Sequence, residues 1–465
     1  MVFNSWQFLV FLLAVLALDS ALQSRPQPRK WMLLLASYIF YGAWSWTYLA
    51  LIIASTLIDF EIGKRMRISA SPRRILLFSI VTNLGILAFF KYANFLIDVL
   101  NFGFSNAQSA FQISNLDILL PVGISFFTFQ ALSYTIDVYR KEIAPRQNLL
   151  DYALFIAFFP QLVAGPIVRA VEFFKELDTP KLPSSREINL GIILIVLGLV
   201  KKMAVADSLA MVVDPVFDAP DSATAIDSLL AVYAYALQIY CDFSGYTDTA
   251  IGCALLFGFR FPQNFNYPYI ASSFQDFWRR WHMTLSRFLR DYLYIALGGN
   301  RYGTTRTQAN LMLTMILGGL WHGASWTFVF WGLLHGSYLV LERGAQKIFP
   351  RFYASKNPVL ITLRWAIVFH GVCFAWIFFR AKTFSDALLV IGNIRALTLA
   401  QLDLTPLMAF LALFGAAHAV GNRYQTNQRL SVAPTWLSGM ALGLALIALW
   451  IYTPQEHKAF IYFQF

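Results

Sequence analysis

The stretch Leu320-Trp321-His322-Gly323-Ala324-Ser325-Trp326 lies inside a region, residues 312–341, that contains no Asp, Glu, Lys or Arg. A membrane-spanning helix needs about 20 mainly apolar residues, so this region predicts membrane helices near 312–320 and 326–341. An ionisable side chain inside a membrane helix is costly, and we therefore expect a functional role for His322. The glycines beside it would allow a close backbone approach or a break in the helix.

The composition of the whole chain agrees with a membrane protein. Its residues are 58% hydrophobic and 13% charged, whereas a soluble domain carries about 25% charged residues. The formal net charge is +11, which we interpret as Lys and Arg in cytoplasmic loops. No polar segment is long enough for a basic nucleic-acid-binding domain, and the three cysteines show no metal or disulfide spacing. We expect one polytopic domain over residues 1–465.

Apolar runs of similar character recur along the chain. Besides the two above, they cover residues 6–18, 31–40, 46–58, 75–90, 92–102, 119–136, 152–163, 188–200, 226–240, 251–257, 363–379, 404–420 and 436–452. Several are too short to cross alone, so we predict an all-α fold with about eleven crossings plus re-entrant and interfacial pieces. The first run is expected to be a retained helix, because it lacks a charged leading segment and an evident small-residue cleavage site.

Basic clusters set the predicted topology. The basic residues of 25–30 precede one apolar run, and those of 64–74 follow the next. Both clusters favour the cytoplasm, so the apolar stretch between them must cross twice, with a hairpin turn at Tyr41-Gly42-Ala43, or not at all. Arg140-Lys141 and Lys201-Lys202 are further candidates for a cytoplasmic position, as simple markers of topology.

Residues 159–166, Phe-Pro-Gln-Leu-Val-Ala-Gly-Pro, interrupt another run. Two prolines and a glycine break backbone pairing, which a bilayer tolerates only where protein or water satisfies the freed groups. We expect either a broken element that lines a cavity or an ordinary loop. The chain has no pair of similarly broken segments in its two halves, which counts against an inverted-repeat transporter.

A basic aromatic block, Phe277-Trp278-Arg279-Arg280-Trp281-His282, belongs to a segment with helical amphipathicity, residues 275–292. Trp278 and Trp281 fall on one face of the predicted helix, and Arg279 and Arg280 on the opposite one. The pattern predicts a helix lying in the membrane interface. Its arginines are either simply solvated, or they bind a phosphate-bearing substrate, for which guanidinium groups are suited. His282, at the edge of the apolar stripe, could face a cavity.

The stretch Asp242-Phe243-Ser244-Gly245-Tyr246-Thr247-Asp248 follows an apolar run and predicts an acidic, glycine-marked turn. In one interpretation its acidic residues form a polar cap of a helix at the interface. In the other, they lock to nearby arginines at the mouth of a cavity. Residues 262–268, Pro-Gln-Asn-Phe-Asn-Tyr-Pro, predict a rigid turn.

Motifs that the sequence lacks limit the types of reaction that it could catalyse. The sequence lacks a nucleophile elbow, a P-loop and a dinucleotide fingerprint, and its histidines have no metal-ligand spacing. A histidine, with a reference pKa of about 6.5, could accept a hydroxyl proton near neutral pH. That chemistry fits transfer of an acyl group from a thioester to an alcohol. On one continuous helix His335 would point away from His322, so only one of the two need be catalytic.

Together these residues resemble the membrane-bound O-acyltransferase (MBOAT) family, in its bacterial branch of alginate O-acetyltransferase-like and cellulose-acetylating proteins. The likeness follows the chain in order over its whole length, and the ordered set is far more specific than any one motif. The matching motifs are QLVAGP at 161–166, DFSGY at 242–246, NFNYPY at 264–269, FWRRWH at 277–282, LRDYLY at 289–294, GGNR at 298–301, WHG at 321–323 and FIYFQF at 460–465.

The resemblance implies a bowl of membrane helices with a tunnel across its thin centre. His322 matches the family's invariant histidine, and His282 matches its second active-site histidine. The implied acyl donor is cytoplasmic acetyl-CoA, a co-substrate, with no bound cofactor and no metal. We predict catalytic roles for these two histidines and substrate-binding roles for a second set: Trp278, Arg279, Arg280, Trp281, Asp242 and Ser244.

The resemblance further implies a multi-pass protein of the bacterial inner membrane that works with a periplasmic acetyltransferase and a polysaccharide synthase or export complex. The branch that transfers D-alanine to a cell-wall polymer shares the two histidines, but the C-terminal motif and Gly298-Gly299-Asn300 favour the acetylating branch. Two other classes stay open. A polysaccharide-precursor transporter would move substrate without consuming a thioester, and a scaffold that docks a synthase would tolerate replacement of His322 and His282.

Overall fold

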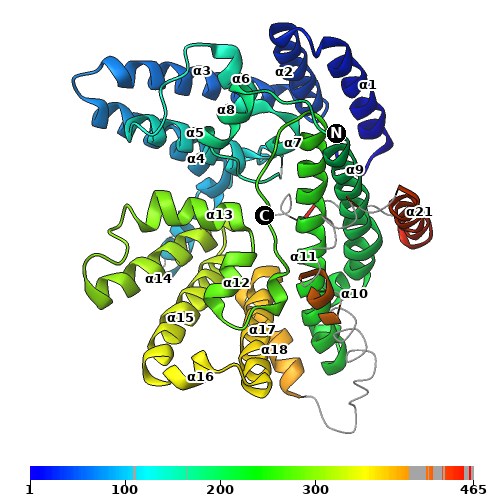
Figure 1. Cartoon of the computed structure of the whole chain (residues 1–465). Helices are drawn as coiled ribbons and strands as arrows, with labels where there is room; N and C mark the ends of the chain where they lie inside the picture. Colours follow the sequence, from blue (N-terminus) through cyan, green and yellow to red (C-terminus); the bar gives the residue numbers. More distant parts are fainter. Residues whose placement is uncertain are drawn as a thin grey trace. The chain divides into compact units, whose positions relative to one another are not determined.

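The computed structural model describes residues 1–107, 111–163, 165–396, 415–416, 418–422, 432, 435–454 and 460–461. Within these ranges the backbone forms helices joined by turns and loops, and no β-strand (Figure 1). The all-α prediction is therefore confirmed for the part of the chain that the structure describes. Most of the predicted run 404–420 and of the terminal FIYFQF motif lies outside these ranges.

The chain divides into two compact units. The first comprises Met1–Ile192 and Thr249–Pro262, and the second comprises Ile193–Asp248 and Gln263–Phe465. Helices α9 (Ser185–Leu199) and α11 (Ala225–Leu256) belong partly to each unit. One domain over residues 1–465 stays a prediction.

The first unit is a group of helices of very different lengths. They are α1 (Trp6–Leu22), α2 (Pro26–Gly42), α3 (Trp46–Ile68), α4 (Pro72–Asn106), α5 (Ile124–Tyr139), α6 (Leu149–Ala157), α7 (Phe159–Leu162), α8 (Ala170–Asp178) and the start of α9. Ser5 and Ser45 cap α1 and α3 by accepting hydrogen bonds from the backbone N–H groups of Phe8 and Tyr48. Only a short turn after Gly42 joins α2 to α3, so the predicted turn is confirmed, whereas the two crossings stay a prediction.

Residues 159–162 of the predicted broken element form a buried turn of helix and not an exposed loop. The four residues of α7 are fully buried. The N–H of Phe159 donates to Ser37 Oγ at 3.1 Å, and Gln161 Nε2 donates to the carbonyl of Phe155. Gly123, with φ +78°, lies so close to the Leu162 carbonyl that a Cβ there would collide with it. Protein groups therefore satisfy the backbone that the prolines interrupt.

Two pairs of predicted runs form one helix each, and the breaks predicted between them are wrong. Runs 75–90 and 92–102 both lie on α4, separated only by Lys91, a good helix former. Runs 226–240 and 251–257 both lie on α11, so the predicted acidic turn at 242–248 is helical. Residues 242–248 are helical because ion pairs within the second unit neutralise Asp242 and Asp248, as described below.

The second unit contains the helices that follow α9, and two of them, η1 and η4, are π-helical. The helices are η1 (Val200–Ala206), α10 (Asp207–Asp218), η2 (Pro220–Ser222), α11, η3 (Pro268–Ile270), α12 (Phe274–Arg280), α13 (Met283–Phe288), η4 (Leu289–Tyr294), α14 (Gly303–His322), α15 (Trp326–Ile348), α16 (Pro350–Ala354), α17 (Pro358–Arg380), α18 (Phe384–Arg395) and α21 (Thr435–Tyr452). Helices α14 and α15 form a tight hairpin. A Cβ on Gly319 would lie 3.0 Å from the backbone of Gly332, so the two helices meet glycine to glycine.

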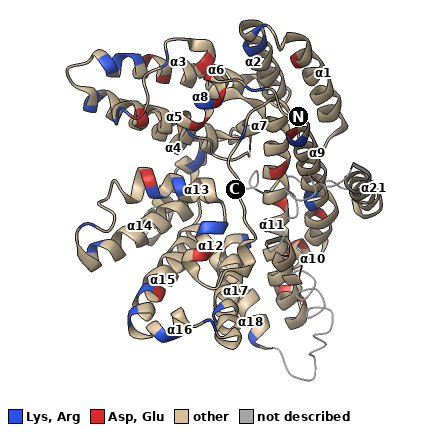
Figure 2. Ribbon diagram, viewed as in Figure 1, with Lys and Arg blue, Asp and Glu red and all other residues tan. Residues whose placement is uncertain are grey.

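Four described helices are long and apolar enough to cross a membrane: those spanning Trp46–Ile68, Pro72–Asn106, Ser185–Asp218 and Pro358–Arg380. Trp6–Leu22 and Ser438–Tyr452 are shorter apolar helices. Figure 2 shows that charged residues are sparse and that most of the ribbon carries neither sign. The number of crossings, about eleven by the apolar runs, stays a prediction.

Candidate active site

His322 is the last residue of α14, and the extended backbone of Gly323 ends the helix there. Its side chain is buried, with 3% of the residue exposed, as the sequence predicts. The imidazole lies 5.1 Å from the ring of Trp331 and 5.3 Å from that of Phe379, both measured between ring centroids. Trp331 comes from α15 and Phe379 from α17, so three helices of the second unit fix the position of this ring.

His282 lies at a break in the backbone, and the prediction of one continuous helix over 275–292 is wrong. Helix α12 ends at Arg280 and α13 begins at Met283, and between them His282 adopts a left-handed φ of +41°. Such a conformation is uncommon for a residue other than glycine and needs support from its surroundings.

The loop before α12 supplies that support. The backbone N–H of Asn266 donates to the Arg280 carbonyl at 2.9 Å, and the N–H of Met283 donates to the Asn264 carbonyl at 2.8 Å. These two hydrogen bonds satisfy backbone groups on either side of the break. The amphipathic pattern of the sequence could not reveal them. The predicted rigid turn at 262–268 thus holds the histidine that follows it.

The Asn264 side chain also orients the His282 ring. Its Oδ1 accepts hydrogen bonds from the backbone N–H of Thr284 at 3.1 Å and from Thr284 Oγ1 at 2.9 Å, and it lies 3.1 Å from His282 Nδ1. The backbone N–H of Thr284 can only donate, so the side-chain atom of Asn264 that accepts from it is the oxygen. Because this oxygen can only accept, His282 Nδ1 must carry the proton of the hydrogen bond between them. In the neutral imidazole Nε2 then holds the lone pair.

The two histidines are neighbours within the second unit. Their ring centroids lie 6.5 Å apart, and the Trp321 ring lies 6.2 Å from that of His282. Phe243 of α11 meets the His282 ring edge to face at 4.7 Å. The site therefore combines two buried imidazoles and aromatic walls.

Asp242 belongs to a buried ion network next to this aromatic wall. Lys202 Nζ lies 2.6 Å from Asp242 Oδ1 and 2.8 Å from Asp207 Oδ1, and all three residues are buried. Asp242 Oδ2 accepts the backbone N–H of Ile461 at 2.7 Å. Lys201 pairs with Asp248 at 2.6 Å. The prediction that Asp242 and Asp248 pair with arginines is wrong, because both pair with lysines.

Lys201 and Lys202, which the sequence predicts to be cytoplasmic, lie within a helix, and their cytoplasmic position stays a prediction. Both residues lie in η1, a π-helical segment that continues α9. A Cβ on Gly245 would lie 2.5 Å from the Gly198 carbonyl oxygen, so α11 approaches α9 and η1 closely there. Ser244, beside this glycine, is fully buried. Close packing and ion pairing together keep residues 242–248 helical.

The predicted aromatic residues of the block lie in different surroundings. Trp281 is fully buried and stacks on Phe277, with ring centroids 5.7 Å apart. Trp278 is partly exposed, and its ring lies 5.1 Å from that of His335. His335 is fully buried on α15, and Trp331 lies between the two histidines of the hairpin, 5.1 Å from His322 and 4.7 Å from His335.

The two predicted phosphate-binding arginines also differ. Arg280 forms an ion pair with Asp276 at 2.9 Å, four residues earlier on the helix. Its guanidinium also donates to the Asn266 carbonyl at 3.3 Å. Arg279 is exposed and forms no ion pair with the residues that the structure describes. Arg279 is therefore the more available of the two for an anionic ligand.

Sequence reasoning did not single out Asn264, Lys202 or Phe243 as site residues. Asn264 was recognisable only as part of a turn, and Lys202 only as a topology marker. Their importance comes from contacts with residues 18 and 40 positions away, which local patterns do not encode. Among the described residues, no group of three or more His, Cys, Asp or Glu side chains could hold a metal ion.

Known proteins are similar to this chain over much of its length. The family model of the membrane-bound O-acyltransferases matches residues 139–384, which include both histidines. A probable alginate O-acetylase of Pseudomonas putida is 39% identical over 100% of both chains. A probable alginate O-acetylase of Azotobacter vinelandii is 44% identical over 83% of this chain and 76% of its own.

A peptidoglycan O-acetyltransferase of Helicobacter pylori is 39% identical over 78% of this chain and 73% of its own. Together with the apolar helices, these likenesses identify a multi-pass membrane protein and an enzyme. The chain belongs to the membrane-bound O-acyltransferase family.

Proposed function

We propose that this enzyme passes acetyl groups from cytoplasmic acetyl-CoA across the bacterial inner membrane for O-acetylation of an exopolysaccharide of the alginate or cellulose type. The observation that carries the proposal is the pair of buried imidazoles, His282 and His322, 6.5 Å apart between ring centroids. The likeness to an alginate O-acetylase over the full length of both chains supports the acetyl group and the polysaccharide acceptor.

In the proposed reaction His322 acts as the general base. Its imidazole takes the proton from the acceptor hydroxyl as the hydroxyl oxygen attacks the thioester carbonyl carbon. The tetrahedral intermediate collapses, the carbon–sulfur bond breaks, and the coenzyme A thiolate leaves. The proton held by His322 passes to that sulfur, so the products are an acetyl ester and the free thiol, and the imidazole returns to its neutral form.

His282 orients the reacting groups in this scheme. Because Nδ1 donates to Asn264, the neutral ring offers Nε2 as an acceptor and can hold a hydroxyl in place. A carbonyl cannot be polarised by Nε2 unless this ring is protonated. The same geometry supports an alternative assignment in which His282 is the base and Asn264 its orienting partner, as in proteases that use a Cys-His-Asn set. The two assignments differ in which histidine holds the transferred proton.

The remaining predicted residues take supporting roles. Arg279, exposed and without an ion pair among the described residues, is suited to bind the coenzyme phosphates, with Trp278 next to it. Arg280 and Trp281 are held by Asp276 and by aromatic packing, so we assign them to the support of His282. Asp242 and Ser244 lie on the same helix as Phe243, the residue that contacts His282, and we propose that they position it.

Acetyl transfer from a membrane enzyme to a polymer outside the membrane requires a second protein that reaches the polymer. We propose a periplasmic acetyltransferase as that partner, in a complex with the polysaccharide synthase or export machinery. The D-alanyl alternative predicts that a D-alanyl thioester and not acetyl-CoA is the donor. The transporter alternative predicts no thioester consumption at all.

The experiment uses the purified full chain in nanodiscs with radiolabelled acetyl-CoA. Release of free coenzyme A is followed with and without the polysaccharide and the partner protein. His322→Ala should abolish release, whereas His370→Ala, a change at an exposed histidine of α17, should leave it unchanged. Release by His322→Ala at the wild-type rate would refute the assignment of the base. An absence of release from well-folded wild-type protein under every combination would favour transport or scaffolding.

A further inference from the structure

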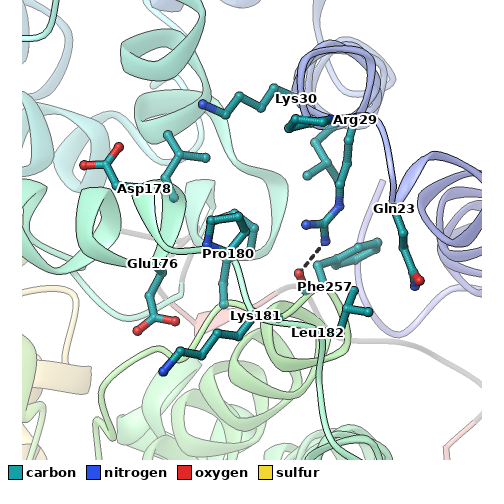
Figure 3. Close-up of a pocket in the computed structure, with 14 residues that line it drawn as sticks. Gln23, Arg29, Lys30, Glu176, Asp178, Pro180, Lys181, Leu182 and Phe257 are labelled. Atoms are coloured by element: carbon teal, nitrogen blue, oxygen red, sulfur yellow. Dashed lines mark hydrogen bonds between the residues drawn. The ribbon is translucent and has the colours of Figure 1, made fainter.

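A cavity of about 410 Å³ lies in the first unit, at the start of α2. Its walls come from the first turn of α2, from residues 176–182 at and after the end of α8, and from residues 257–259 (Figure 3). The volume is within the range of about 300–1,000 Å³ that is typical of small-ligand sites. Every lining residue belongs to the first unit, whereas both histidines belong to the second.

The cavity has an apolar floor and a charged rim. Leu33 and Phe259 are buried at its floor, and the apolar side chain of Leu182 is exposed. Lys30 and Lys181 contribute positive charge to the rim, where Figure 3 shows them on either side of Pro180. Glu176 and Asp178 also line the cavity, but each carboxylate pairs with an arginine that does not line it, Arg260 at 3.1 Å and Arg146 at 2.6 Å. A lining of this kind suits a ligand that has a charged group at one end and an apolar body at the other.

The surrounding helices indicate the depth of the cavity in the membrane. Helices α1 and α2 are antiparallel, because the N-terminal amine of Met1 donates to the carbonyl of Phe40 near the end of α2. Both present exposed apolar side chains, among them Leu9, Leu13, Leu35 and Ile39. Exposed tryptophans mark the two ends of the hairpin: Trp6, Trp44 and Trp46 at one, and Trp31 at the other.

Helices α1 and α2 are not among the described helices that are long and apolar enough to cross a membrane. Tryptophans at the ends of the hairpin and basic residues beside one end are nevertheless typical of helices that lie in a bilayer with the basic end at the cytoplasmic interface. Trp31 directly follows Arg29 and Lys30, so the cavity lies at the basic end, at the level of the lipid headgroups.

The cations of the rim differ in their availability. Arg29 is engaged by Asp19 at 2.7 Å and by the carbonyl of Phe257 at 2.7 Å, the bond drawn in Figure 3. Lys30 pairs with Asp151 at 2.7 Å but has two further N–H donors. Lys181 is exposed and has no ion pair with any residue that the structure describes.

The position of Lys181 is fixed by its backbone. Gly258 has φ +84°, and a Cβ there would lie 2.5 Å from the Lys181 carbonyl oxygen. The chain that carries this lysine is therefore pressed against residues 257–259, so it forms a defined wall of the cavity.

We propose that this cavity binds the headgroup of a membrane phospholipid. The phosphate is paired with Lys181 and lies in the field of Lys30, and the acyl chains follow the exposed apolar faces of α1 and α2. A soluble phosphate ester could form the same ion pairs, but it would not contact the apolar floor and would not need a cavity at headgroup depth. A phospholipid is therefore the favoured source of the phosphate.

The test is native mass spectrometry of the full chain titrated with phosphatidylglycerol, and separately with diacylglycerol that has the same acyl chains. The phospholipid should bind and the diacylglycerol should not compete with it. Lys181→Glu should weaken the first phosphatidylglycerol bound by roughly five- to tenfold, the effect of about one kcal/mol per lysine near a lipid phosphate. Lys356→Glu, a change at an exposed lysine that does not line the cavity, is the matched control and should have no effect.

Two competition experiments distinguish a lipid phosphate from a soluble one. Inorganic phosphate and coenzyme A are added as soluble competitors, and neither should displace the lipid at millimolar concentration. Displacement by coenzyme A that is also weakened by Lys181→Glu would assign the cavity to a soluble ligand and overturn the lipid proposal. Equal binding of the phospholipid and the diacylglycerol, or identical binding by Lys181→Glu and wild type, would overturn it as well.

Discussion

His282 and His322, both buried in the second unit, are held in different ways. His322 ends a regular helix, and the rings of Trp331 and Phe379 lie beside it. His282 lies in a left-handed break, and its Nδ1 donates to Asn264. The hydrogen bond to Asn264 fixes which nitrogen of His282 carries the proton. A fixed tautomer suits the orienting role that we propose for His282.

The largest expected effect is on the rate when either imidazole is removed. His322→Ala should lower coenzyme A release by about 10²- to 10⁴-fold, the usual contribution of a general base. His282→Ala should cost less, because an orienting group lowers the barrier by a smaller amount. Initial rates at equal amounts of membrane protein measure both losses. A larger loss in His282→Ala than in His322→Ala would exchange the two roles.

The next largest effect concerns the ion network that supports the wall beside His282. Lys202→Met leaves Asp242 and Asp207 buried next to an apolar side chain, and should destabilise the protein by about 3–5 kcal/mol. The exposed pair of Lys382 and Asp218 provides a matched control, because Lys382→Met removes an ion pair that is worth only about 0–1 kcal/mol.

Thermal unfolding of the two variants in the same nanodiscs compares the buried pair with the exposed one. Equal melting temperatures for Lys202→Met and Lys382→Met would show that the buried network contributes nothing beyond a surface pair.

Asn264 tests the hydrogen bond on which the comparison depends. Asn264→Leu removes the acceptor of Thr284 and His282, and should slow the reaction by roughly 10- to 100-fold, equivalent to about 1–3 kcal/mol for buried donors left unsatisfied. Asn264→Asp keeps an acceptor at the same place and should restore most of that rate.

The aspartate variant should also shift the pH dependence. A carboxylate beside His282 stabilises the protonated imidazole, so the acid limb of the pH–rate profile should move to higher pH. The profile of wild-type protein, measured alongside, is the reference. An unchanged profile in Asn264→Asp would mean that the protonation of His282 does not enter the rate.

The contrast between the two histidines also explains how much the sequence could reveal. His322 was predictable, because an ionisable residue in an apolar run and the glycines next to it are local features, and its burial is confirmed. The all-α fold follows from the apolar runs in the same way. The break at His282 was not predictable, because amphipathicity continues smoothly through 275–292 while backbone bonds from 264–266 stop the helix.

The helical state of residues 242–248 was hidden for a similar reason. Two aspartates and a glycine in a row of seven indicate a turn when no partner is known. Lys201 and Lys202 neutralise the charges, and the glycine allows η1 to approach. Contacts between distant residues thus decided the structure at 242–248 as they did at His282.

The smallest expected effects distinguish the two arginines that lead into the break. Arg280→Gln removes the ion pair with Asp276 and the bond to the Asn266 carbonyl, so it loosens the segment that carries His282. An exposed ion pair is worth about 0.2–1 kcal/mol, which corresponds to a fall in kcat of roughly two- to fivefold with little change in KM.

Arg279→Gln should have the opposite signature, because this exposed residue supports no part of the break. If Arg279 binds the coenzyme phosphates, it stabilises the bound substrate and the transition state equally. Its replacement should then raise KM for acetyl-CoA roughly two- to fivefold and leave kcat constant. Steady-state kinetics on the two variants separates positioning of His282 from binding of the donor. A change in kcat in both variants would mean that both arginines act through the break, and the donor phosphates would then have to be bound elsewhere.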